Sequence, residues 1–80
     1  MPETFPLTAL AATPDGRVVY AGSPNSLLRS DDGGRTWTAT GYRGSAFAIA
    51  TSPDGGTVAV VSRDTDYYRS TDGGKTWPGP

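Results

Sequence analysis

The chain has 80 residues, with seven lysines and arginines against eight aspartates and glutamates, and its net charge of −1 provides no basic field for binding nucleic acid. Cysteine and histidine are both absent, which excludes disulfides, thiol chemistry and the commonest metal ligand and general base, so we expect no metal and no cofactor. No apolar run is long enough for a membrane helix and no signal-peptide pattern opens the chain, so we expect no membrane partner, and the compartment stays undetermined.

Short strands joined by tight turns are favoured over helices, because the chain contains eleven glycines and seven prolines. In the first half, strands are predicted at residues 7–13, 17–21 and 27–30, and a fourth begins at Thr36. The first of these is rich in small residues, which suits a crowded innermost position. The second has apolar residues for both of its faces, as a central strand requires. Pro14, Asp15 and Gly16 have the chemistry of a turn between these two strands.

The second half repeats this order of elements. Strands are predicted at residues 46–52, 57–62 and 67–70, and a fourth begins at Thr76. Residues 53–56 match the turn of the first half but contain one additional residue, which we place at Gly56 because a turn tolerates an insertion best. The units predicted from this repetition are residues 1–40 and residues 41–80.

Two segments forty residues apart are near copies, Ser-Asp-Asp-Gly-Gly-Arg-Thr-Trp at residues 30–37 and Ser-Thr-Asp-Gly-Gly-Lys-Thr-Trp at residues 70–77. These are the first and the second hairpin motif. A repeat at this period is typical of units that stack on their neighbours to bury apolar faces, and propeller blades are the commonest all-strand case. The predicted fold class is all-β, with two four-stranded antiparallel propeller blades that complete a β-propeller by homo-oligomerisation.

The pattern Ser-x-Asp-Gly-Gly-x-Thr-Trp resembles the Asp-box (BNR/sialidase-type) repeat, which sialidases, sortilin-type receptors, xyloglucanases and photosystem assembly factors carry in β-propeller blades. The resemblance covers both halves of the chain. It implies that the serine and aspartate hydrogen-bond N–H groups of the turn, that the glycines adopt positive φ and that the tryptophan packs beneath the turn. The residues concerned are Ser30, Asp32, Gly33, Gly34, Thr36 and Trp37, with Ser70, Asp72, Gly73, Gly74, Thr76 and Trp77 in the second copy.

The carboxylates of the hairpin motifs are interpreted as structural groups. One aspartate per turn falls far short of the about six to eight oxygen ligands that Ca²⁺ takes. Glycosidases need a carboxylic acid with a raised pKa beside a second carboxylate, or in sialidases a tyrosine nucleophile, whereas Glu3 is the only glutamate of the chain. Arg69 precedes the second motif as Arg29 precedes the first, and such repetition indicates a structural role. We therefore expect no enzyme activity.

The connectors between strands have diverged most between the two halves, and they are expected at the end of each blade opposite the hairpin motifs. Loops held by a rigid scaffold are where binding residues concentrate. A ligand-binding rim is therefore one hypothesis for this end, and ordinary solvated loops are the alternative. The candidate residues are Tyr42, Arg43, Arg63, Asp64 and Asp66.

An isolated pair of blades leaves one large apolar face exposed on each side, because a propeller buries these faces only when its ring closes. Identical chains are therefore predicted to assemble head to tail, each contributing two blades, so that only even blade totals arise. Three to five chains satisfy this condition, and three or four are favoured.

Three functions are compatible with these features. The favoured one is a non-enzymatic propeller building block, natural, fragmentary or engineered, whose activity is self-assembly. The alternatives are a lectin-like module that binds carbohydrate in the grooves between blades and gains avidity from several sites, and an inactive fragment of a glycosidase-type propeller. A lectin is expected to repeat its binding loops, whereas the loops of the two halves differ, so the building block is preferred.

Overall fold

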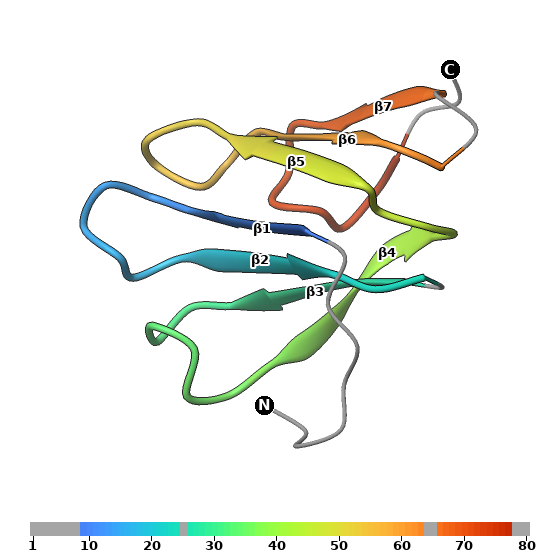
Figure 1. Cartoon of the computed structure of the whole chain (residues 1–80). Coiled ribbons are helices and arrows are strands. Elements are labelled where there is room, and N and C mark those ends of the chain that lie inside the picture. Colours follow the sequence, from blue (N-terminus) through green and yellow to red (C-terminus); the bar gives the residue numbers. More distant parts are fainter. Residues whose placement is uncertain (1–8, 25, 64–65, 78–80) are drawn as a thin grey trace.

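A computed structural model describes residues 9–24, 26–63 and 66–77, and the predicted all-β class is confirmed. Two antiparallel sheets follow one another along the chain, with strand orders β1-β2-β3-β4 and β5-β6-β7 (Figure 1). The strands are β1 (Ala9–Ala12), β2 (Val19–Gly22), β3 (Ser26–Ser30), β4 (Thr38–Arg43), β5 (Ala48–Thr51), β6 (Val58–Val61) and β7 (Tyr67–Ser70). Across these described ranges, no helix has the length and apolar character needed to span a membrane.

The turn between β1 and β2 is fixed by side-chain hydrogen bonds that the sequence itself supplies. Asp15 Oδ1 accepts hydrogen bonds from the Thr13 hydroxyl at 2.6 Å and from the Arg17 N–H at 3.0 Å. Gly16 follows with φ of 74°, a conformation that residues with a Cβ rarely adopt. Residues 52–57 form the same structure between β5 and β6.

The last strands of both sheets differ from the prediction. β4 begins at Thr38, two residues later than expected, and it extends to Arg43 across the predicted boundary between residues 40 and 41. Thr76 and Trp77 are not part of a strand, and the remainder of the fourth strand predicted for the second half lies outside the described residues. Both motif turns extend through their threonine, because the Thr36 and Thr76 N–H groups still bind the motif aspartates.

The additional residue of the second half is not at Gly56, so that prediction is wrong. Val19 lies opposite Ser30, and Val58 lies opposite Ser70. Residues 9–22 therefore correspond to 48–61, whereas residues 26–37 correspond to 66–77, which places the additional residue in the loop between β6 and β7. The hydrogen-bonded turns of residues 13–18 and 52–57 keep one length, so the length difference lies at the opposite end of the sheets.

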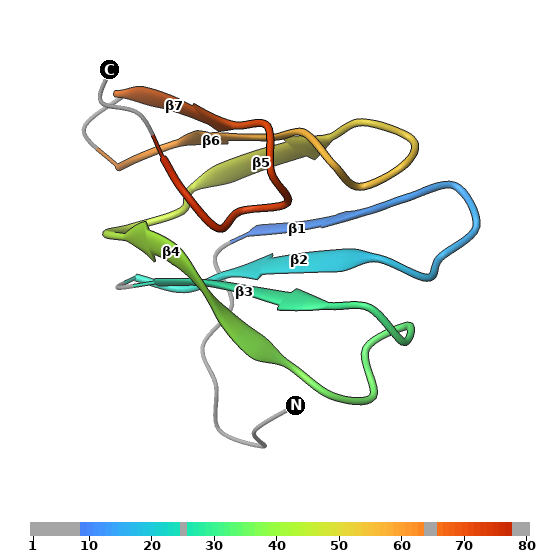
Figure 2. The same cartoon turned by 180° about the vertical axis from the view of Figure 1, so that it is seen from behind.

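The core lies between the two sheets, where β1 and β5 run side by side (Figures 1 and 2). It contains the buried side chains of Val18, Tyr20, Leu27, Tyr42, Ala46, Val58 and Val60, with Ile49, Tyr68 and Trp77 packed against them. Because side chains alternate along a strand, each sheet also has an outer face directed away from the other sheet. The outer face of the first sheet carries Leu10, Val19 and Leu28, and that of the second sheet carries Ala59, Val61, Tyr67 and Arg69.

The two ends of the sheets carry different connections, as the sequence predicts. At one end, the Gly33 N–H donates to the Arg17 carbonyl at 2.9 Å, which joins the first hairpin motif to the β1–β2 turn. At the other end, the loops contact one another, and the Arg63 N–H donates to Ser45 Oγ at 2.9 Å.

Candidate functional site

The hairpin motifs are organised around a buried serine. Ser30, at the end of β3, is only 1% exposed. Its hydroxyl donates to Asp32 Oδ1 at 2.7 Å and accepts the Gly34 N–H at 2.8 Å. Gly33 and Gly34 have φ of 77° and 100°, so the chain reverses without the strain that a Cβ would introduce.

Asp32 binds the returning side of the first hairpin motif. Its Oδ1 accepts the N–H groups of Arg35 at 3.0 Å and Thr36 at 2.9 Å, and its Oδ2 accepts the Thr36 hydroxyl at 2.6 Å. The Thr36 hydroxyl and N–H and the Ser30 hydroxyl hold the pKa of Asp32 far below its ordinary value of 3.8. The carboxylate is therefore ionised and fully engaged within its own turn.

The second hairpin motif has the same geometry. Ser70 donates to Asp72 Oδ1 at 2.7 Å and accepts the Gly74 N–H at 3.0 Å. Hydrogen bonds from the Thr76 hydroxyl and N–H again lower the pKa of Asp72 strongly. Across the described residues, no group of three or more acidic side chains converges on one point that could hold a metal ion.

The tryptophans bind the motif glycines through the indole. Trp37 Nε1 donates to the Gly34 carbonyl at 2.9 Å, and Trp77 Nε1 donates to the Gly74 carbonyl at 2.8 Å. Only Trp77 also meets the core, where its ring lies 5.1 Å from that of Tyr42 in an edge arrangement. The two copies of the motif therefore share one local structure but have different surroundings.

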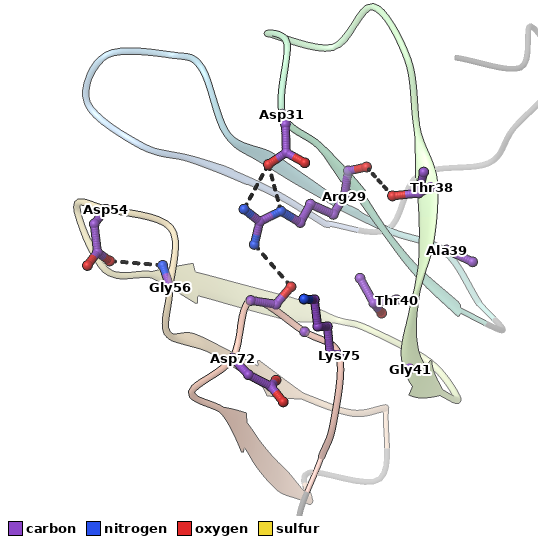
Figure 3. A pocket seen from close by; sticks show the side chains of 12 residues that line it. Arg29, Asp31, Thr38, Ala39, Thr40, Gly41, Asp54, Gly56, Asp72 and Lys75 are labelled. Atoms are coloured by element: carbon purple, nitrogen blue, oxygen red, sulfur yellow. Dashed lines mark hydrogen bonds and ion pairs between the residues drawn. The ribbon is translucent and has the colours of Figure 1, made fainter.

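A groove of about 780 Å³ lies between the two sheets, beside the second hairpin motif (Figure 3). One wall comes from β3 and β4, and the other comes from the turn of residues 54–56 and the second motif. The charged groups along it are Arg29, Asp31, Asp54, Asp72 and Lys75. None of the residues that line the groove is aromatic.

Arg29 crosses the boundary between the sheets at this groove, as the dashed contacts in Figure 3 illustrate. Its Nη1 donates to the carbonyls of Gly73 at 3.0 Å and Gly55 at 3.2 Å, and we term this pair of contacts the arginine bridge. The Tyr20 hydroxyl accepts from Nη1 and donates to the Gly55 carbonyl, both at 2.8 Å. Asp31 accepts from Nε at 2.9 Å and Nη2 at 2.7 Å, which fixes the plane of the guanidinium.

Two acidic side chains of the groove have lowered pKa values. Hydrogen bonds from the Ser52 hydroxyl and the Gly56 N–H lower the pKa of Asp54, as the motif bonds do for Asp72. Asp31 is paired with Arg29. Asp54 and Asp72 are therefore held as anions by hydrogen bonds within their own turns.

The structure buries one of the residues predicted for the rim. Tyr42 is only 5% exposed, so its assignment to the rim is wrong; its ring packs on Tyr68 and its hydroxyl donates to the Ser45 carbonyl. Arg43, Arg63 and Asp66 are exposed, and Asp64 lies outside the described residues. The ring of Tyr42 is buried because it packs on Tyr68 and Trp77, a contact that the sequence did not predict.

The sequence also failed to identify the inter-sheet role of Tyr20 and the partners of Arg29. The repetition of Arg29 at Arg69 indicates a structural role, and the structure shows that Arg29 fills this role by binding backbone carbonyls of the second sheet's turns. Tyr20 had no such signal, because the corresponding residue of the second sheet is Ala59.

Solved structures with the same backbone arrangement are β-propeller proteins. A GH74 enzyme from Niastella koreensis is 31% identical, with a TM-score of 0.74 over 88% of this chain. YCF48 bound to a D1 peptide is 22% identical, with a TM-score of 0.74 over 89%. A GH74 xyloglucanase from Xanthomonas campestris is 24% identical, with a TM-score of 0.73 over 91%. The chain has a β-propeller-type fold.

The likeness concerns only a part of each of these proteins. The chain spans 11% of the Niastella enzyme, 24% of YCF48 and 13% of the Xanthomonas enzyme. No family model and no curated protein matches the sequence. The comparisons therefore support a propeller segment and leave its activity to be inferred from its own residues.

Proposed function

We propose that this chain is a non-enzymatic β-propeller building block of the Asp-box type, in which each sheet is one blade. Copies of the chain associate head to tail and close a ring. The hairpin motifs hold the turns of each blade, and the arginine bridge joins one blade to the next. The propeller-type fold of the solved neighbours and their much greater length support a segment that needs further blades.

The observation that carries this proposal is the contrast between the inner and outer faces of the sheets. Ile49 packs against the core between the sheets, whereas Leu10, the corresponding residue of the first sheet, is 61% exposed. Tyr67, on the outer face of the second sheet, is 55% exposed. Each outer face therefore presents an apolar side chain that further stacking would bury, and burying it would stabilise an assembly by about 25 cal/mol per Å².

The chemistry of the groove supports a structural role over catalysis or sugar binding. Hydrolysis of a glycoside needs a carboxylic acid with a raised pKa, whereas the pKa values of Asp54 and Asp72 are lowered. Sugar-binding sites typically stack an aromatic ring on the sugar, and the groove is lined by none. Incubation with xyloglucan is therefore expected to release no reducing sugar above the level of a buffer control.

Sedimentation equilibrium of the 80-residue chain over a wide concentration range tests the proposal. We expect a discrete species of three to five chains, with three or four favoured, and a far-ultraviolet circular dichroism spectrum typical of strands. A folded monomer at every concentration would contradict the proposal, and so would unlimited growth into fibres, because head-to-tail contacts must close to form a ring.

A further inference from the structure

The arginine bridge is made once within the chain, and the two outer faces carry the separate halves of a second bridge. Arg29 lies opposite Tyr20 on β2, and Arg69 lies opposite Ala59 on β6. These two arginines are therefore corresponding residues of the two sheets. Arg29 faces the second sheet, whereas Arg69 faces away from the first.

Arg69 is exposed, and it has no hydrogen-bond or ion-pair partner among residues 9–24, 26–63 and 66–77. The position that corresponds to Asp31 is Thr71, so Arg69 also lacks the carboxylate that holds Arg29 in place. None of the five N–H groups of this guanidinium is therefore bound within the described part of the chain.

The matching acceptors lie on the first sheet. Gly55 and Gly73 supply the carbonyls of the arginine bridge, and the corresponding residues are Gly16 and Gly33. The carbonyls of Gly16 and Gly33 accept no hydrogen bond from the part of the chain that the structure describes. Gly16 lies in the β1–β2 turn and Gly33 lies in the first hairpin motif, and their φ values of 74° and 77° match those of Gly73 and Gly55.

We propose that Arg69 forms a second arginine bridge to Gly16 and Gly33 of a second copy of this chain. The inference rests on the proposed self-assembly, and it names the contact that defines the interface between copies. Donor and acceptors of the same chain cannot meet, because the two outer faces point away from each other (Figures 1 and 2). The contact is heterologous, since the outer face of the second sheet meets the outer face of the first.

The side chains around Arg69 differ in size from those around Arg29. On the inner face of the first sheet, Tyr20 is the large residue, and Gly22 and Leu27 are beside it. On the outer face of the second sheet, the corresponding residues are Ala59, Val61 and Tyr67. Each face has one tyrosine near its arginine, on β2 in the first sheet and on β7 in the second, and Val61 stands where the first sheet has Gly22.

Sedimentation equilibrium of Arg69→Ala, compared with the unchanged chain, tests this inference. We expect the dissociation constant per interface to rise at least tenfold, because charge-assisted hydrogen bonds to two buried carbonyls are lost; tenfold corresponds to about 1.4 kcal/mol. Arg43→Ala is the matched control: it removes an equal charge from an exposed residue of β4, at the opposite end of the sheets from the hairpin motifs. Urea denaturation of both variants below the association range is expected to match the unchanged chain, because no partner of Arg69 is present among the described residues.

The outcomes separate this inference from the proposed function. If the unchanged chain is monomeric at all concentrations, the proposed function fails and the second bridge fails with it. If the unchanged chain assembles and Arg69→Ala assembles with the same dissociation constant, self-assembly stands and the second bridge is wrong. An equal weakening by Arg43→Ala would also contradict the bridge, because it would indicate a general effect of charge.

Discussion

At the scale of single residues, identical local structures differ in importance because their surroundings differ. The indoles of Trp37 and Trp77 make the same hydrogen bond to the glycine three residues before them. Trp77 in addition packs on Tyr42 within the core, whereas no aromatic partner of Trp37 is present among the described residues. The motif alone predicts that the two tryptophans contribute equally to stability, whereas the structure indicates that Trp77 contributes more.

Trp77→Ala is therefore expected to cost more stability than Trp37→Ala. Removing Trp77 opens a cavity beside Tyr42, with an expected loss of about 3 kcal/mol, whereas Trp37→Ala costs about half of that or less. Urea denaturation of both variants at one low protein concentration measures the two costs. Equal losses in dilute solution would contradict the unequal packing of the two rings.

At the scale of elements, the hairpin motif could be predicted in detail because its stabilising contacts are local. Ser30 and Asp32 satisfy N–H groups at most four residues away, so the spacing of residue types alone determines which atoms can meet. The order of strands in each sheet follows from the same short-range turns, and so do the different connections at the two ends of the sheets. The all-β class is confirmed.

Features that depend on distant segments could not be predicted. The partners of Arg29 are backbone carbonyls 26 and 44 residues away, and a carbonyl carries no signature in the sequence. The sequence places Tyr42 on a rim because it lies in a divergent connector, but its burial depends on Tyr68 of the other sheet and on Trp77. The insertion was misplaced for a related reason, since only strand register distinguishes Gly56 from the β6–β7 loop.

The motif aspartates also predict how stability depends on pH. The pKa values of Asp32 and Asp72 are lowered in the folded chain, whereas those of the unfolded chain stay near 3.8. Above that pH both states are ionised and the full stabilisation is present. As the pH falls below about 4, the unfolded state takes up protons first, so the free energy of unfolding decreases.

The double variant Asp32→Asn/Asp72→Asn should therefore be less stable at neutral pH and should lose less stability between pH 5 and pH 2. Thr36→Val/Thr76→Val keeps both carboxylates but removes the hydroxyls that lower their pKa most, so it should also be less stable at neutral pH and should also lose less stability between pH 5 and pH 2 than the unchanged chain. Thermal melts across this range measure both effects. The same pH dependence in all three proteins would show that the motif bonds do not hold the carboxylates ionised.

At the scale of the whole molecule, the two sheets pack so closely that backbone atoms make part of the contact between them. The Gly41 N–H in β4 donates to the Gly74 carbonyl of the second hairpin motif at 2.8 Å. Gly22, at the end of β2, lies directly against Ala46 and Ile49. The corresponding residue on the outer face of the second sheet is Val61, so this close approach belongs to the contact between the sheets and not to the strand itself.

Gly22→Ala tests whether this spacing stabilises the chain. A Cβ at residue 22 would lie 2.6 Å from the Cβ of Ala46 and 2.7 Å from its carbonyl oxygen. The sheets would have to separate, which lengthens the arginine bridge, and we expect a loss of about 1 to 3 kcal/mol in urea denaturation. Gly56→Ala is the control, because its nearest atom is the flexible end of Asp54 at 3.3 Å; it should change stability by less than about 1 kcal/mol. Equal effects would refute tight contact between the sheets, whereas partial rescue by Ala46→Gly would support it, since that change removes the Cβ clash and leaves the carbonyl.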